Sequence, residues 1–206
     1  MSGTIKNLVL FKLGWLACVF FAAAGKPLLA TAAVALVAVL HLVSVPLAVK
    51  EAVLLVCAAL IGLAWESLLV YSGLLSYPGI ESASSLAPYW IVAMWVLFAT
   101  TINHGLRWTK KHWAVAFTAG LLGGPMAFYG GASMGAVEFS NTMLALVAIG
   151  AGWAVLLPLL TWIADSIIDS PWLEPQEPVN EPRPTRFTEP VPLPIFERSI
   201  DRDRGV

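Results

Sequence analysis

The sequence predicts an all-α, polytopic membrane protein with six transmembrane helices and a separate proline-rich tail. Hydrophobic residues make up 58% of the chain and charged residues only 12%, whereas a soluble domain has roughly 25% charged residues. A soluble protein of this length cannot bury so much apolar surface in one core, but a bilayer can accept it. These features divide the chain into a transmembrane domain at 1–164 and a tail at 165–206.

Six apolar stretches are long enough to cross a bilayer, which takes about 20 residues of helix. We predict these spans at 5–24, 27–47, 52–73, 88–106, 113–130 and 142–164. Helices are expected because unpaired backbone groups are costly in hydrocarbon and the alternating pattern of a strand is absent. Short breaks separate the spans, among them Lys50-Glu51 and the basic segment 107–112.

The tail has a different composition from the spans. It holds nine acidic residues and five arginines, and eight of the fourteen prolines lie between Pro171 and Pro194. Because proline removes a backbone donor and fixes φ, both helix and sheet are unfavourable here. We predict an extended, solvated, disordered tail, with a proline-motif ligand as the alternative.

The distribution of basic residues predicts the orientation of the spans. With an inward N-terminus, the inner side holds most of them, namely Lys6, Lys50, Arg107, Lys110, Lys111 and the arginines of the tail. The outer side then holds Lys26, Glu81 and Glu138. The opposite orientation would place nearly all basic residues outside. We therefore expect a multi-pass protein of the inner (plasma) membrane with both termini in the cytoplasm.

The sequence contains no familiar catalytic or cofactor motif. GxSxG, HExxH, P-loop and dinucleotide fingerprints are all absent. His41, His104 and His112 do not have the spacing of metal ligands, so we predict no metal site and no cofactor. A net charge of −1 gives no reason to expect nucleic acid as a partner. The expected partners are the lipid bilayer and, beyond it, a lipid or another membrane protein.

Glu66 is the first candidate functional residue, because an acidic group inside a span costs roughly 2.5–3.5 kcal/mol to insert. It lies fifteen residues after Glu51, about 22 Å along the third span. Ala58, Gly62 and Gly73 share its helical face, which predicts that Glu66 faces neighbouring helices. It is a candidate proton or cation site or a catalytic acid. The alternative is a protonated carboxyl group that hydrogen-bonds a neighbouring helix.

The fifth span contains a predicted break at a depth similar to that of Glu66. Gly123, Gly124 and Pro125 follow one another there, and the proline is expected to kink the helix. Broken helices at such depth occur where they line a cavity. We predict an outer-half site walled by Glu66 and this kink, beneath Glu138. A kink that serves only helix packing is the alternative.

A second candidate site lies in the inner leaflet. Thr100, Asn103, His104 and Arg107 are spaced by three and four residues, so they are predicted to form one polar stripe on the fourth span. The stripe could bind a lipid head group or a polar substrate that arrives from inside, or it could serve interhelical hydrogen bonding. His41 is expected at a similar depth, as an interior histidine rather than a ligand.

Four sequence segments resemble a known family: FKLGW, GLLSYP, APYWIVAMWVLFATTINHGLRW and GGPMAFYGGASMGAVEF. In them the chain is similar to a bacterial family of small integral membrane proteins known as domain of unknown function 2878, from about Asn7 to Ala164. The resemblance implies a bacterial inner membrane and no established activity. Proteins of this family often occur alongside lipid-modification enzymes, which favours a role linked to lipid.

Three functions are compatible with these residues. The first is an accessory or lipid-handling membrane protein without chemistry of its own, which the absence of a catalytic constellation favours. The second is a small proton-coupled carrier that uses Glu66. The third is an intramembrane lipid-modifying enzyme that uses Asn103, His104 and Arg107.

Overall fold

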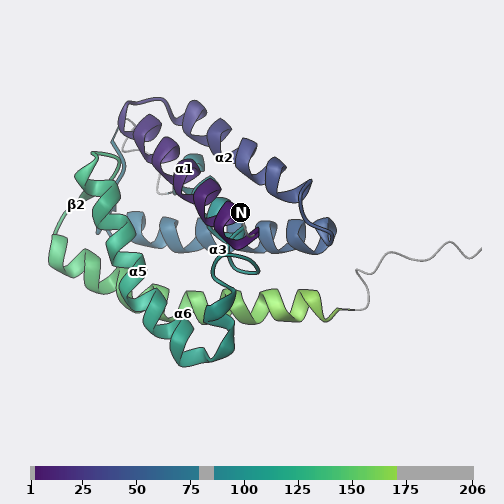
Figure 1. Cartoon of the computed structure of the whole chain (residues 1–206). Helices are drawn as coiled ribbons and strands as arrows, with labels where there is room; N and C mark the ends of the chain where they lie inside the picture. Colours follow the sequence, from purple (N-terminus) through teal and green to yellow (C-terminus); the bar gives the residue numbers. More distant parts are fainter. Residues whose placement is uncertain (1–2, 79–85, 171–206) are drawn as a thin grey trace, which may run out of the picture. The chain divides into compact units, whose positions relative to one another are not determined.

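Helices account for nearly all regular structure in the computed structural model, which describes residues 3–78 and 86–170 (Figure 1). The α-helices are α1 (Gly3–Ala23), α2 (Pro27–Leu42), α3 (Ala48–Tyr71), α4 (Tyr89–Ala99), α5 (Trp113–Ser133) and α6 (Thr142–Ile168). A 3-10 helix, η1, covers Arg107–Lys111. Two short strands, β1 (Leu75–Ser76) and β2 (Glu138–Phe139), pair antiparallel. The predicted all-α class is confirmed.

Three of the described helices, α1, α3 and α6, are long and apolar enough to cross a membrane. Their 21, 24 and 27 residues correspond to about 31, 36 and 40 Å of helix, against a hydrocarbon core of about 30 Å. The helices also expose many large hydrophobic side chains, for example Leu28 at 75% and Met126 at 74%. Extensive exposed apolar surface is typical of a protein that contacts lipid. The predicted number of six spans stays a prediction, because α2 and α4 are shorter and α5 is not among the helices that are both long and apolar enough.

The helix α4 lies at the centre of the helical arrangement. It packs against α1, α2 and α3. The helix α5 packs against α6, and α1 lies beside α2 (Figure 1). The α4 residues Trp95, Leu97 and Ala99 are buried. Aromatic contacts also join α4 to α6, since the rings of Trp95 and Trp153 stack with their centroids 4.6 Å apart. The interior position explains why a helix of only 11 residues is tolerated among apolar neighbours.

The helix α4 is shorter than the predicted span at 88–106, and the prediction is wrong beyond Ala99. The chain continues in turns from Thr100 to η1. The Asn7 side chain of α1 supports this departure from the helix. Its amide donates to the carbonyl of Thr100 (2.9 Å), and its oxygen accepts from the backbone N–H of Gly105 (3.1 Å). Non-helical backbone among apolar helices is tolerated where other protein groups make its hydrogen bonds.

Two other boundaries in the structure differ from the predicted ones. The helix α3 begins at Ala48, so Lys50 and Glu51, predicted as a break between spans, lie in its first turn and are buried. The helix α6 ends at Ile168, so residues 165–168, assigned to the tail, are helical. From residue 171 on, the predicted disordered tail lies outside the described residues, and so does Glu81.

The helices α5 and α6 approach each other closely through glycine. A Cβ atom on Gly120 would collide with the backbone carbonyl of Trp153, and one on Gly124 would collide with the Trp153 side chain. A Cβ on Gly150 would lie 3.2 Å from the ring of Pro125. The helix α5 continues through that proline without interruption. The glycines therefore permit the close contact of α5 with α6.

Candidate functional site: a His–Glu–His cluster beside a basic pocket

Several helix ends meet in one polar region. Lys50, in the first turn of α3, donates to the carbonyl of Ile168 at the C-terminus of α6 (2.6 Å). Lys110 of η1 forms an ion pair with Asp165 of α6 (2.6 Å). Asn7, near the N-terminus of α1, holds the turn that follows α4. The region thus gathers the beginnings of α1 and α3 and the ends of α2, α4 and α6.

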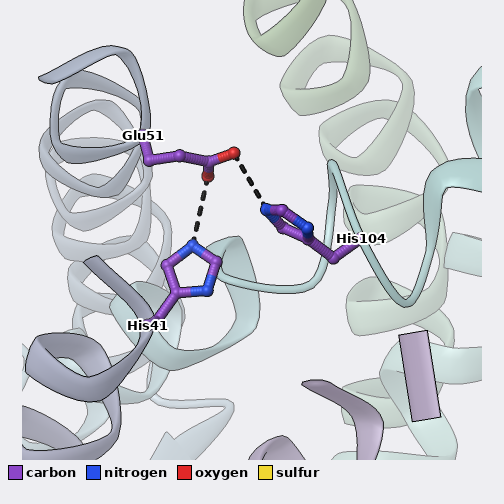
Figure 2. Close-up of side chains that lie close together, drawn as sticks. All are labelled: His41, Glu51 and His104. Carbon is purple, nitrogen blue, oxygen red and sulfur yellow. Dashed lines mark hydrogen bonds and ion pairs between the residues drawn. The ribbon is translucent and has the colours of Figure 1, made fainter. Parts of the chain in front are cut away.

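Glu51 lies at the centre of this region, between two histidines that point their rings at its carboxylate (Figure 2). The Nε2 atom of His41 lies 3.3 Å from Glu51 Oε2, and the Nε2 atom of His104 lies 3.0 Å from Glu51 Oε1. The two imidazole rings meet edge to face with centroids 4.9 Å apart. His41 and Glu51 are buried, while the His104 side chain is 30% exposed. We call these three residues the His–Glu–His cluster.

A chain of polar side chains extends from the cluster to α6. The amide of Asn103 donates to Glu51 Oε1 (3.1 Å) and accepts from Lys110 Nζ (2.7 Å). Lys110 in turn pairs with Asp165. Because each member fixes the orientation of the next, the Glu51 carboxylate is held in place by more than the two histidines.

Two hollows border the cluster. The first has a volume of about 350 Å³, and its lining includes both histidines together with Lys6, Asn7 and Ser44. The second has a volume of about 650 Å³, and we call it the basic pocket. It is lined by Asn103, Arg107, Trp108, Lys110, Lys111 and Ile168. Within residues 3–78 and 86–170, the side chains of Arg107 and Lys111 have no hydrogen-bonding or ion-pair partner, so the basic pocket carries unpaired positive charge.

Glu66 lies in a different part of the molecule and is fully buried. It accepts hydrogen bonds from the Tyr77 hydroxyl (2.7 Å) and from Trp95 Nε1 (2.9 Å). Burial raises the pKa of Tyr77 well above its ordinary value, so the phenol stays protonated and able to donate. A cavity of about 80 Å³, walled mostly by apolar and aromatic side chains, adjoins Glu66.

The residues of the predicted outer-half site are spread over several places. The α5 residues that line the cavity beside Glu66 are Ala127, Phe128 and Gly131, which follow the proline. Gly124 and Pro125 face α6, Gly123 faces open space, and the exposed Glu138 accepts from the Ser76 hydroxyl at 3.3 Å. The structure therefore brings Glu66 next to α5 but does not gather the other four predicted residues around it.

The predicted inner-leaflet stripe is only partly brought together. Asn103 and His104 both contact Glu51, and Arg107 lines the neighbouring basic pocket. Thr100 is buried and donates to the carbonyl of Leu97.

Glu51 is not among the predicted site residues, because it lies in a predicted break between spans. No contact between His41 and His104 is predicted either. The three cluster residues come from α2, α3 and the turn after α4, so their spacing in the sequence does not match a metal-ligand motif. The one feature of the sequence that pointed to this site was the similar predicted depth of His41 and His104.

A family model described as a protein of unknown function (DUF2878) matches residues 4–159. This match confirms the resemblance inferred from the sequence, and it includes all three residues of the His–Glu–His cluster. No curated protein and no solved structure matches the chain.

Proposed function

We propose that this chain, which belongs to the DUF2878 family of proteins of unknown function, is a multi-pass membrane protein that binds the phosphate-bearing head group of an anionic lipid. The binding site is the basic pocket. The observation that carries this proposal is the presence of two cationic side chains, Arg107 and Lys111, that line one pocket and have no partner among the described residues.

The position of the pocket favours a lipid over a freely soluble anion. It lies where η1 meets the end of α6, beside apolar helices of bilayer length. Trp108, which also lines it, is 47% exposed. Tryptophan together with lysine and arginine is typical of the membrane–water interface, where acidic head groups are found. An acyl chain could then lie along the exposed apolar surface of the helices.

The charges in the pocket fit a phosphodiester group. Lys110 is already paired with Asp165 and hydrogen-bonded to Asn103, so its charge is largely compensated. The charges available to a ligand are those of Arg107 and Lys111. A guanidinium group can donate two parallel hydrogen bonds to phosphate oxygens, and an ammonium group adds a second positive charge.

We also propose that the basic turns and both termini lie in the cytoplasm. Lys50, Arg107, Lys110 and Lys111 all lie near the polar region of the cluster, which supports placing that region at the cytoplasmic face of the inner membrane. The basic pocket would then face the cytoplasmic leaflet, whose surface carries the negative charge that attracts such segments.

The structural setting of Glu66 supports lipid handling over a proton-coupled carrier. Both carboxylate oxygens of Glu66 already accept hydrogen bonds from buried donors, and the adjoining cavity is small and mostly apolar. A carrier site would need a polar route to the carboxylate, and the residues that line this cavity supply none.

Lipid binding can be tested by thermal unfolding of the purified protein in a neutral detergent. Phosphatidylglycerol at ten times its Kd should stabilise the wild type by about 1.4 kcal/mol, which raises Tm by roughly 3–5 °C. The double variant Arg107→Ala/Lys111→Ala should lose this shift. The variant Lys26→Ala, which removes an exposed lysine elsewhere in the chain, should keep it.

Two further ligands identify the source of the phosphate group. Phosphatidylcholine tests whether net negative charge is needed, and inorganic phosphate tests whether a free anion suffices. An equal shift in the double variant, or an equal shift with phosphatidylcholine, would refute the proposal. A full shift with inorganic phosphate alone would show that the pocket binds a soluble anion instead.

A further inference from the structure

We infer that His41, Glu51 and His104 form a binding site for a divalent transition-metal ion, with Zn²⁺ as the best fit. The site would supply three protein ligands and leave one coordination position open. This inference goes beyond lipid binding and does not depend on it, because none of the three ligands lines the basic pocket.

The distances between the ligand atoms support the inference. The ligand nitrogens of His41 and His104 and the carboxylate oxygen of Glu51 all lie within 4.8 Å of one another. Zinc bonds to these ligands of about 2.0–2.2 Å in a tetrahedral arrangement separate the ligand atoms by roughly 3.3–3.6 Å. The His41 nitrogen lies 3.3 Å from Glu51 Oε2 and the His104 nitrogen lies 3.0 Å from Glu51 Oε1, so each nitrogen is already close to that distance from one carboxylate oxygen. A bound ion would draw both nitrogens and one carboxylate oxygen from within 4.8 Å of one another to this spacing.

The chemistry of the ligands selects the class of ion. Two imidazole nitrogens and one carboxylate suit Zn²⁺ and neighbouring first-row metals. Ca²⁺ and Mg²⁺ prefer an all-oxygen set, which the cluster does not provide. Three protein ligands with a free fourth position are characteristic of zinc sites that bind a water molecule or a substrate, whereas structural sites usually have four protein ligands.

The surroundings of Glu51 resemble the outer shell of known metal sites. Carboxylate ligands in such sites are usually oriented by hydrogen bonds from a second layer of residues. Here Asn103 donates to Glu51 Oε1, Lys110 donates to Asn103, and Asp165 pairs with Lys110. The charge of the lysine is thus compensated by its own acidic partner.

An ion can reach the cluster from the hollow of about 350 Å³ that both histidines line. The His104 side chain is 30% exposed, while the other two ligands are buried. The open coordination position is therefore expected on the side of this hollow. A bound ion would also join α2, α3 and the turn after α4.

Metal binding is best measured on protein purified without a polyhistidine tag, in detergent. Titration with Zn²⁺ against a chromophoric chelator should give one ion per chain, and Co²⁺ should give the visible absorption of a four-coordinate site. His104→Ala removes the most exposed ligand and should weaken binding at least tenfold. The matched control is His112→Asn, because His112 is exposed and outside the cluster, and asparagine can still accept from the Ala114 N–H.

A second measurement on the wild type avoids any folding defect of a variant. Diethyl pyrocarbonate should modify both His104 and His112 in the metal-free protein, and Zn²⁺ should protect only His104. Equal modification of His104 with and without Zn²⁺, or equal affinity in wild type and His104→Ala, would overturn the inference. In that case the cluster is a hydrogen-bonded contact between helices.

Discussion

At the scale of single residues, Glu66 shows how a carboxylate can be accommodated among apolar helices. It is fully buried, and its two oxygens accept from Tyr77 and Trp95. The small residues on the same face of α3 predicted that Glu66 faces neighbouring helices. The structure agrees, because Ala58 is buried and Gly62 lies against the Trp95 ring. The two donors, which come from outside α3, could not be identified from the sequence.

Replacement of Glu66 tests whether its role is structural. Glu66→Ala removes both acceptors and leaves two buried donors and a void, so we expect a loss of about 3 kcal/mol in the free energy of unfolding. Glu66→Gln keeps one acceptor and should lose less. Thermal unfolding in detergent checks the order of the two variants. A Glu66→Ala protein as stable as the wild type would contradict this account.

At the scale of elements, the contact between α5 and α6 depends on the absence of side chains. Gly120 and Gly124 are four residues apart, a spacing that suits close helix packing, and the structure places both against Trp153. The partner helix could not be predicted, because the spacing does not identify which helix approaches.

Alanine substitutions in α5 separate packing from helix propensity. Gly120→Ala should destabilise the protein despite a propensity gain of roughly 0.8–1 kcal/mol, because its Cβ meets the Trp153 backbone. Gly123→Ala is the matched control and should be neutral or stabilising, since its Cβ would enter open space, with no neighbouring side chain within 4 Å. Unfolding midpoints measure both. Equal midpoints for the two variants would argue against the packing role of Gly120.

At the scale of the whole molecule, the number of membrane crossings follows from which side each connection occupies. A fluorescent protein fused after Lys111 should be active, because it folds in the cytoplasm, and alkaline phosphatase fused after Gly135 should be active, because it requires the periplasm. Both fusions are expected to be active if α5 crosses the bilayer with the basic turn in the cytoplasm. Activity of only one of the two fusions would show that α5 does not cross, and inactivity of both would show the opposite orientation.

Composition and segment length were enough to predict the all-α class and the three described helices of bilayer length, because both are local properties of the chain. The sequence also predicted that Glu66 is buried. Long-range contacts, which no local pattern predicts, end α4 at Ala99, where Asn7 binds the carbonyl of Thr100, and bring His41, Glu51 and His104 together. These contacts join separate elements of the chain, and the cluster residues Glu51 and His104 are 53 residues apart in the sequence.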